Sequence, residues 1–230
     1  MHPEYIEAFT RKVAIDPAKT ALIPVDLQYA SGSREHGLGA LLASQGKLDE
    51  ASYRFDRIEK LVIPNTKRLL DAWRGLGARV IYVTLGCELP DYADAAPSTR
   101  AFFTATKNTI GNREHEIVDE IKPLPGELVI NKRTQGAFAS SGIESALRGL
   151  GVETIVVTGV STNNCVETTA REASDRGFGV VMVSDATGTC SDEMQNATLK
   201  GFSRLWGRVA STDEVIAELR AGRALDVAAE

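Results

Sequence analysis

The amino-acid sequence predicts an α/β fold, with a doubly wound, mainly parallel six-stranded sheet that carries helices on both faces. Short runs of β-branched and other apolar residues alternate along the chain with longer stretches of helical periodicity. The short runs are almost continuously apolar, which is typical of parallel strands buried on both faces. The chain has 230 residues, of which 43% are hydrophobic, enough for one large domain. We therefore expect a single domain over residues 1–230, with its core at about 20–215.

Strands and helices are predicted in alternation, which favours right-handed crossovers between parallel strands. The predicted strands are Ala21–Asp26, Arg79–Thr84, Leu128–Asn131, Thr154–Thr158, Val180–Ser184 and the short Arg208–Ala210. The predicted helices are Arg57–Leu76, Arg113–Ile121, Gly142–Leu150, Asn164–Arg176, Asp192–Leu205 and Thr212–Ala221. Two long segments break the alternation, Ala30–Ser52 and Gly86–Gly111. Long connections inside a compact domain tend to be lids or binding loops.

Composition and charge exclude several classes of partner. The formal net charge is −5 and the isoelectric point is near 5.4, and no stripe of basic residues indicates nucleic-acid binding. The first residues, MHPEYIEAFTRK, lack the apolar stretch of a signal peptide, and no run of about 18 apolar residues could span a membrane. We therefore expect a cytoplasmic protein that acts on a small molecule, without nucleic-acid or membrane partners.

Three polar residues stand near the ends of predicted strands, where ligands bind in open α/β sheets. Asp26 ends the first strand, Lys132 follows the third, and Cys165 comes shortly after the fourth, where a helix begins. Taken singly, Asp26 fits a strand-end cap, Lys132 fits a solvated charge, and Cys165 fits a small buried residue. Together they supply what is needed to form a thiolate, hold it and transfer its proton. The helix N-terminus and the lysine are both expected to lower the pKa of the Cys165 thiol.

Three ordered motifs contain these residues: ALIPVDLQ around Asp26, LVINKRTQGAF around Lys132, and TGVSTNNCVETTAREASDRGF around Cys165, followed by VVMVSDATGT. The motifs resemble those of the isochorismatase-like cysteine hydrolases, which include N-carbamoylsarcosine amidohydrolase, nicotinamidase, biuret hydrolase and ureidoacrylate hydrolase. The resemblance runs from about Ala21 to Val215. It implies that the three residues form a catalytic triad, and that the chain assembles into a dimer or tetramer.

The resemblance also implies an activity, the cysteine-dependent cleavage of a C–N bond in a small amide, carbamoyl or ureido substrate. A covalent thioester would form, and ammonia or an amine would be released. The Val160–Ser161 peptide bond is expected to be cis, and the backbone N–H groups of Ser161 and Cys165 to form the oxyanion hole. Glu167 is expected to support the nucleophile. The substrate-binding candidates are Gln28, His36, Thr134, Phe138 and Thr162, although Phe138 equally fits a core position.

Other activities remain open on the sequence alone. An isochorismatase-type vinyl-ether hydrolase would need a basic lining for a cyclic dicarboxylate, and Arg34 and Arg133 are the obvious candidates. A nicotinamidase-like carboxamide hydrolase is a second alternative. A non-enzymatic binding protein on the same scaffold is a third, and the presence of all three triad residues argues against it.

The histidine pattern bears on a metal site. Nicotinamidases place an Asp-x-His pair and a further histidine near the first loop and the second strand. Here His36 lacks the Asp-x-His context, and the stretch LGCELPDYAD after the second strand contains no histidine. The sequence therefore predicts catalysis without a metal ion or another cofactor.

Removal of metal ions tests this expectation. Dialysis against EDTA should leave at least most of the activity on any ureido or carboxamide substrate that the enzyme hydrolyses, because a thiolate and a lysine need no Lewis acid. The measurement is ammonia release before and after chelation, with and without added zinc, manganese or magnesium. Loss on chelation and recovery with one ion would contradict the prediction.

Overall fold

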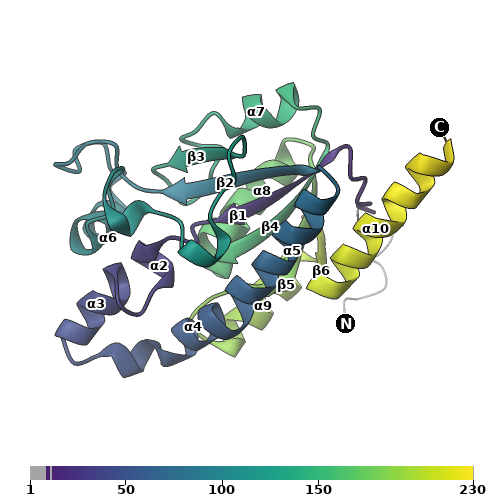
Figure 1. Ribbon diagram of the computed structural model, residues 1–230. Coiled ribbons are helices and arrows are strands. Elements are labelled where there is room, and N and C mark those ends of the chain that lie inside the picture. Colours follow the sequence, from purple (N-terminus) through teal and green to yellow (C-terminus); the bar gives the residue numbers. More distant parts are fainter. Residues whose placement is uncertain (1–8, 11, 230) are drawn as a thin grey trace.

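The predicted sheet is present in the computed structural model, which describes residues 9–10 and 12–229 (Figure 1). All of its strand pairs are parallel, and the strand order is β3-β2-β1-β4-β5-β6. This order confirms the doubly wound prediction, with its topological switch point between β1 and β4. The strands are β1 (Thr20–Val25), β2 (Arg79–Leu85), β3 (Leu128–Lys132), β4 (Thr154–Val160), β5 (Gly179–Gly188) and β6 (Arg208–Ala210).

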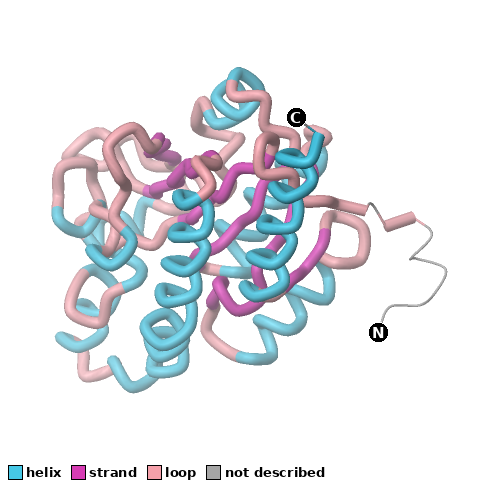
Figure 2. The backbone as a smooth tube through the Cα atoms, turned by 45° about the vertical axis from the view of Figure 1, so that its right-hand side comes forward, coloured by secondary structure: helices cyan, strands magenta, loops and turns pink. Residues whose placement is uncertain are grey.

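Helices cover both faces of the sheet, as Figure 2 shows. Among the described residues, none of these helices is long and apolar enough to cross a membrane. Their bounds are α2 (Tyr29–Gly32), α3 (Gly37–Ser44), α4 (Ser52–Arg57), α5 (Ile63–Gly75), α6 (Arg100–Thr106), α7 (Ile143–Gly149), α8 (Glu167–Asp175), α9 (Asp192–Phe202) and α10 (Thr212–Ala229). A π-helical segment, Ile58–Val62, joins α4 to α5.

Two hydrophobic cores lie on opposite faces of the sheet, because successive side chains of a strand point to opposite sides. Ile23 and Val25 of β1 pack in the core beneath α7, α8 and α9. Leu22, which precedes Ile23, packs in the other core with residues of α5 and α10. Burial on both faces explains why these strands are continuously apolar in the sequence.

The predicted helix over Arg113–Ile121 is wrong. This stretch instead contains two short 3₁₀ turns, Arg113–His115 and Asp119–Ile121. Between them, Ile117 forms an antiparallel bridge with Gln28, and the Val118 N–H donates to the Leu27 carbonyl at 3.1 Å. Pairing with the segment that follows β1 extends the backbone here, so a tertiary contact overrides the local helical pattern.

The two long segments that break the alternation are partly helical. The first contains α2 and α3, and the second contains α6. In Figure 1 these three helices lie together beyond the carboxyl ends of β1 and β2. They stand where a lid or a binding loop would be expected.

Gly159, near the end of β4, allows close approach of β4 to β1 at the switch point. Its φ is +113°, which L side chains rarely adopt. A Cβ atom at this position would lie 1.9 Å from the Val25 carbonyl oxygen, which is fixed in the neighbouring strand. Glycine is therefore required where the chain leaves β4 for the site.

Gly159→Ala should destabilise the protein by about 3 kcal/mol or more, because it combines backbone strain with an overpacked strand pair. Gly201→Ala is the matched control. Gly201 lies in α9, and a Cβ there would meet nothing within 4 Å. The control should gain up to about 1 kcal/mol. Urea denaturation measures both, and similar stabilities for the two variants would contradict the prediction.

Candidate active site

Asp26 follows β1 directly and is 1% exposed. Its backbone is left-handed, with φ at 53°, a conformation that aspartate tolerates better than most residues. The Asp26 N–H donates to the Val83 carbonyl of β2 at 2.9 Å, which anchors the turn. Carboxylate Oδ2 accepts a bond from Lys132 Nζ at 2.9 Å. Carboxylate Oδ1 is buried and has no hydrogen-bond partner among the described residues.

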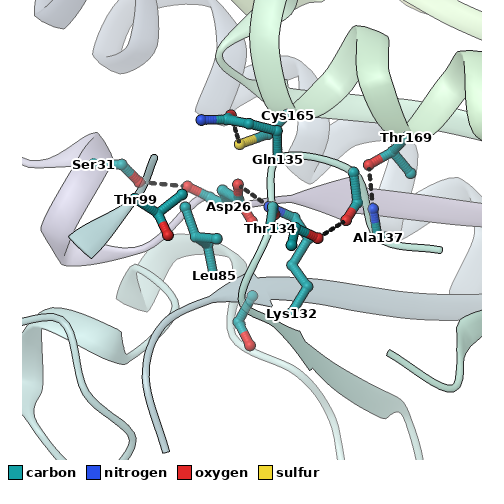
Figure 3. Close-up of polar contacts among 12 residues, drawn as sticks. Asp26, Ser31, Leu85, Thr99, Lys132, Thr134, Gln135, Ala137, Cys165 and Thr169 are labelled. Atoms are coloured by element: carbon teal, nitrogen blue, oxygen red, sulfur yellow. Dashed lines mark hydrogen bonds and ion pairs between the residues drawn. The ribbon is translucent and has the colours of Figure 1, made fainter. Parts of the chain in front are cut away.

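Lys132 is the last residue of β3 and reaches Asp26 across the end of β2 (Figure 3). Two inter-strand spacings, about 10 Å, separate β3 from β1, so a long side chain is needed. The Lys132 ammonium is fully buried and also donates to the Thr134 carbonyl at 3.1 Å. Its charge is therefore held at one position by two oxygen atoms.

Cys165 lies in a π-helical turn, Thr162–Val166, that leads into α8. Its thiol donates to Gln135 Oε1 at 3.1 Å, from the loop after β3 (Figure 3). The Val160–Ser161 peptide bond just before this turn is cis, as the resemblance implies. Asp26, Lys132 and Cys165 thus come from three strand ends and converge on one place.

A cavity of about 440 Å³ opens at this place, a size that fits a small organic molecule. It lies at the switch point, since residues that follow β1 and β4 line it. Both long segments contribute to its wall. The wall includes Asp26, Ser161 and Cys165, with Leu38 from α3, Phe102 from α6, and Asn108.

Comparison with known proteins identifies the family of the chain. A family model described as the isochorismatase domain matches residues 56–214. The chain belongs to the isochorismatase family. A relative from Agrobacterium fabrum, named ureidoacrylate amidohydrolase RutB, is 30% identical over 218 residues, which cover 88% of this chain and 90% of that protein. The resemblance noted in the motifs is confirmed at the level of the family.

Two solved structures share the isochorismatase fold. A cysteine hydrolase from Pseudomonas syringae superposes with a TM-score of 0.77 and 23% identity, covering 92% of this chain and 97% of that chain. An N-carbamoylsarcosine amidase from Thermoplasma acidophilum gives a TM-score of 0.63 and 24% identity, covering 85% of this chain and 97% of that chain. At these sequence identities, the superpositions show that the fold is shared, and they show nothing beyond the fold.

The pKa values of the three converging groups depend on one another. The pKa of the Cys165 thiol is raised to about 12, first by burial and then by the Asp26 charge, against the opposing effect of Lys132. Burial also raises the pKa of Asp26, although Lys132 and Cys165 oppose it. Burial acts to lower the pKa of Lys132, but the charges of Asp26 and Cys165 outweigh it and leave that pKa raised.

The expectation of a lowered thiol pKa is therefore wrong. The loss of water around the sulfur outweighs the attraction of Lys132, so Cys165 holds its proton at rest. The raised pKa of Asp26 also makes its carboxylate a better proton acceptor than an exposed aspartate.

Of the five expected substrate-binding residues, only Gln28 lies among the described residues of the cavity wall. Its side-chain amide bonds to the backbone. Nε2 donates to the carbonyl oxygens of Leu85 at 3.1 Å and His115 at 2.7 Å. Oε1 accepts from the Leu85 N–H at 2.7 Å. Gln28 therefore joins the ends of β1 and β2.

His36 and Thr162 lie outside the cavity wall. His36 directly precedes α3, and its ring meets that of Tyr29 edge-on, with centroids 4.9 Å apart. The buried Thr162 hydroxyl donates to Gln195 Oε1 at 2.6 Å. The His36 ring therefore contacts Tyr29, and the Thr162 hydroxyl bonds to Gln195.

Thr134 and Phe138 hold the loop after β3. The Thr134 hydroxyl donates to the Gly136 carbonyl at 2.8 Å, and its own carbonyl accepts from Lys132. Phe138 packs in the hydrophobic core, where its ring centroid lies 6.0 Å from that of Phe178. The core position considered for Phe138 is the one that the structure displays.

Sequence reasoning missed two residues of the site. Gln135 stands three residues after Lys132, inside a motif already singled out, so a search of that motif for polar side chains would have found it. Arg54 lines the cavity from α4, and nothing in its local sequence distinguishes it from the neighbouring surface arginines. Glu167, expected to support Cys165, pairs with Arg171 at 2.7 Å.

No three His, Cys, Asp or Glu side chains of the described residues are grouped so that they could hold a metal ion.

Lys132→Met should cost about 3–5 kcal/mol of stability, because it leaves the Asp26 carboxylate buried without a counter-ion. The double variant Asp26→Asn/Lys132→Met should recover part of this loss, since it removes both charges. Urea denaturation of the wild type, the two single variants and the double variant measures the coupling. A double variant no more stable than Lys132→Met would contradict the interpretation.

Proposed function

We propose that this isochorismatase-family hydrolase is a cysteine-dependent amidohydrolase, which cleaves a C–N bond of a small amide, carbamoyl or ureido substrate. The observation that carries the proposal is that a protonated thiol and a buried carboxylate line one cavity, and that a buried ammonium bonds to this carboxylate. This set can generate a nucleophile on demand. The ureidoacrylate amidohydrolase named among the relatives supports the same bond class.

In the acylation step, Asp26 Oδ1 accepts the thiol proton while the sulfur attacks the substrate carbonyl. Oδ1 is suited to this role because it is buried without a partner, whereas Oδ2 is occupied by Lys132. The backbone N–H groups of Ser161 and Cys165 would stabilise the oxyanion, since N–H groups in the first turn of a helix lack partners within the helix. The C–N bond then breaks, and the proton on Asp26 passes to the departing ammonia or amine.

In the deacylation step, Asp26 takes a proton from a water molecule that attacks the thioester. The C–S bond breaks, the sulfur regains its proton, and the acid or carbamate leaves. Lys132 stays charged throughout and holds Asp26 in place.

The arginines considered for a vinyl-ether hydrolase do not favour that activity. Arg34 pairs with Glu59 at 2.9 Å and with Asp56, and Arg133 pairs with Glu88 at 2.8 Å. Neither arginine is among the described residues of the cavity wall. Both arginine side chains therefore form ion pairs with carboxylates of the protein itself.

A panel of ureido and carboxamide compounds, scored for ammonia release, tests the proposal. The wild type should hydrolyse at least one class, and Cys165→Ser should lose at least about 1,000-fold in kcat/KM, because a hydroxyl is far harder to ionise beside a single aspartate. Cys87→Ala is the control, because Cys87 is a buried thiol outside the cavity wall. Intact mass spectrometry of quenched wild-type reactions should reveal an acyl adduct on Cys165. Near-wild-type turnover by Cys165→Ser would remove the assigned nucleophile.

A further inference from the structure

The described wall of the cavity contains one cationic side chain, that of Arg54 in α4. Its guanidinium spans the switch point. Nη1 donates to Ser161 Oγ at 2.6 Å, just after β4, and Nη2 donates to the Ser31 carbonyl at 3.0 Å, in α2, the first helix after β1. The Ser31 hydroxyl in turn donates to the Asp26 carbonyl at 2.6 Å (Figure 3). Arg54 therefore borders the same space as the proposed nucleophile and base.

The charge of Arg54 has no counter-ion among the described residues. Both of its hydrogen-bond partners are neutral, and its Nε is buried without a partner. Glu50, one helical turn earlier, borders the cavity but is exposed and makes no ion pair with Arg54. Other arginines of the chain, such as Arg34 and Arg171, do pair with carboxylates.

Arg54 is half-buried. Even partial burial without a counter-ion is unfavourable for a cation, and it lowers the pKa of Arg54 below the ordinary value. Its two hydrogen bonds occupy two of the five N–H groups of a guanidinium, so three remain. An anion that enters the cavity would supply the missing charge. A carboxylate suits this site best, because its two oxygens match the planar donor set of an arginine.

We propose that Arg54 binds a carboxylate of the substrate while the scissile carbonyl lies at Cys165. The inference rests on the proposed amidohydrolase function and narrows it to one substrate class. The substrates are small ureido or amide acids, with the carboxylate a few bonds from the C–N bond that breaks. A cavity of about 440 Å³ limits the spacer to a short one.

A different role for Arg54 would give a different kinetic result when Arg54 is replaced. If Arg54 only positioned Ser31 and Ser161, or stabilised the oxyanion, its loss would affect charged and neutral substrates equally. If it binds the carboxylate, its loss weakens only the binding of the acid. The ratio of the KM values for a charged and a matched neutral substrate therefore distinguishes these roles.

The kinetic test compares 3-ureidopropanoate with butylurea, a neutral compound of similar length. Arg54→Gln should raise KM for the acid about 10- to 100-fold, the range expected for a lost charged hydrogen bond, and should change KM for butylurea little. Arg54→Lys should fall between the wild type and Arg54→Gln for the acid. Equal losses on both compounds, or no loss on either, would overturn the proposal.

Arg57→Gln is the matched control. Arg57 lies in the same helix and also donates to two carbonyl oxygens, of Thr187 at 3.0 Å and Ser184 at 2.9 Å, but it is not among the described wall residues. Its substitution removes similar tethers, so the acid-to-neutral ratio should stay as in the wild type. A change in this ratio as large as that of Arg54→Gln would count against a specific role for Arg54.

Binding to the Cys165→Ser protein tests the inference without turnover. Isothermal titration should give an affinity for 3-ureidopropanoate at least about 10-fold above that for butylurea, and Arg54→Gln in this background should abolish the difference. Absence of the preference would overturn the role of Arg54. Failure of the wild type to hydrolyse any compound of the ureido and carboxamide panel would count against the amidohydrolase function, whereas the binding result would stand on its own.

Discussion

The buried ion pair between Asp26 and Lys132 is the interaction on which the rest of the site depends. Both charges are removed from water at the ends of strands that are not neighbours, and each is tolerable only because the other is present. The pair requires a lysine at the end of β3, a left-handed turn after β1, and an intervening β2 that ends in apolar Leu85. Because Lys132 occupies one carboxylate oxygen of Asp26, the other oxygen has no partner among the described residues and is the one assigned to the thiol proton in the proposed reaction.

The sheet could be predicted from the sequence because burial on both faces leaves a direct trace, a short and continuously apolar run. The three-residue strand β6 follows this rule less closely, because it begins with Arg208 and only Ala210 is buried. The stretch over Arg113–Ile121 could not be predicted, because its conformation is set by the pairing of Ile117 and Val118 with Gln28 and Leu27, about 90 positions earlier. A local periodicity contains no information about such a partner.

The site was predictable to the extent that it is built from strand ends. Asp26, Lys132 and Cys165 stand where a doubly wound fold places its ligands. The motifs around Lys132 and Cys165 lie within residues 56–214, which the family model matches. The protonation state of the thiol was not predictable, because it depends on how completely the folded chain excludes water from the sulfur. Arg54 was hidden for a related reason, since only the fold shows that its charge faces a cavity and lacks a carboxylate partner.

Charge balance connects these observations. At rest, Asp26 and Lys132 neutralise each other, Cys165 is neutral, and the positive charge of Arg54 is left over. In the proposed reaction, proton transfer from Cys165 to Asp26 moves a negative charge from carboxylate to sulfur without creating a new one. Lys132 interacts with both groups, so it stays next to a negative charge before and after the transfer. A substrate carboxylate at Arg54 would neutralise the charge that is left over there. The thiol of Cys165 would then meet the substrate carbonyl while Asp26, Lys132 and Arg54 each lie beside a charge of opposite sign.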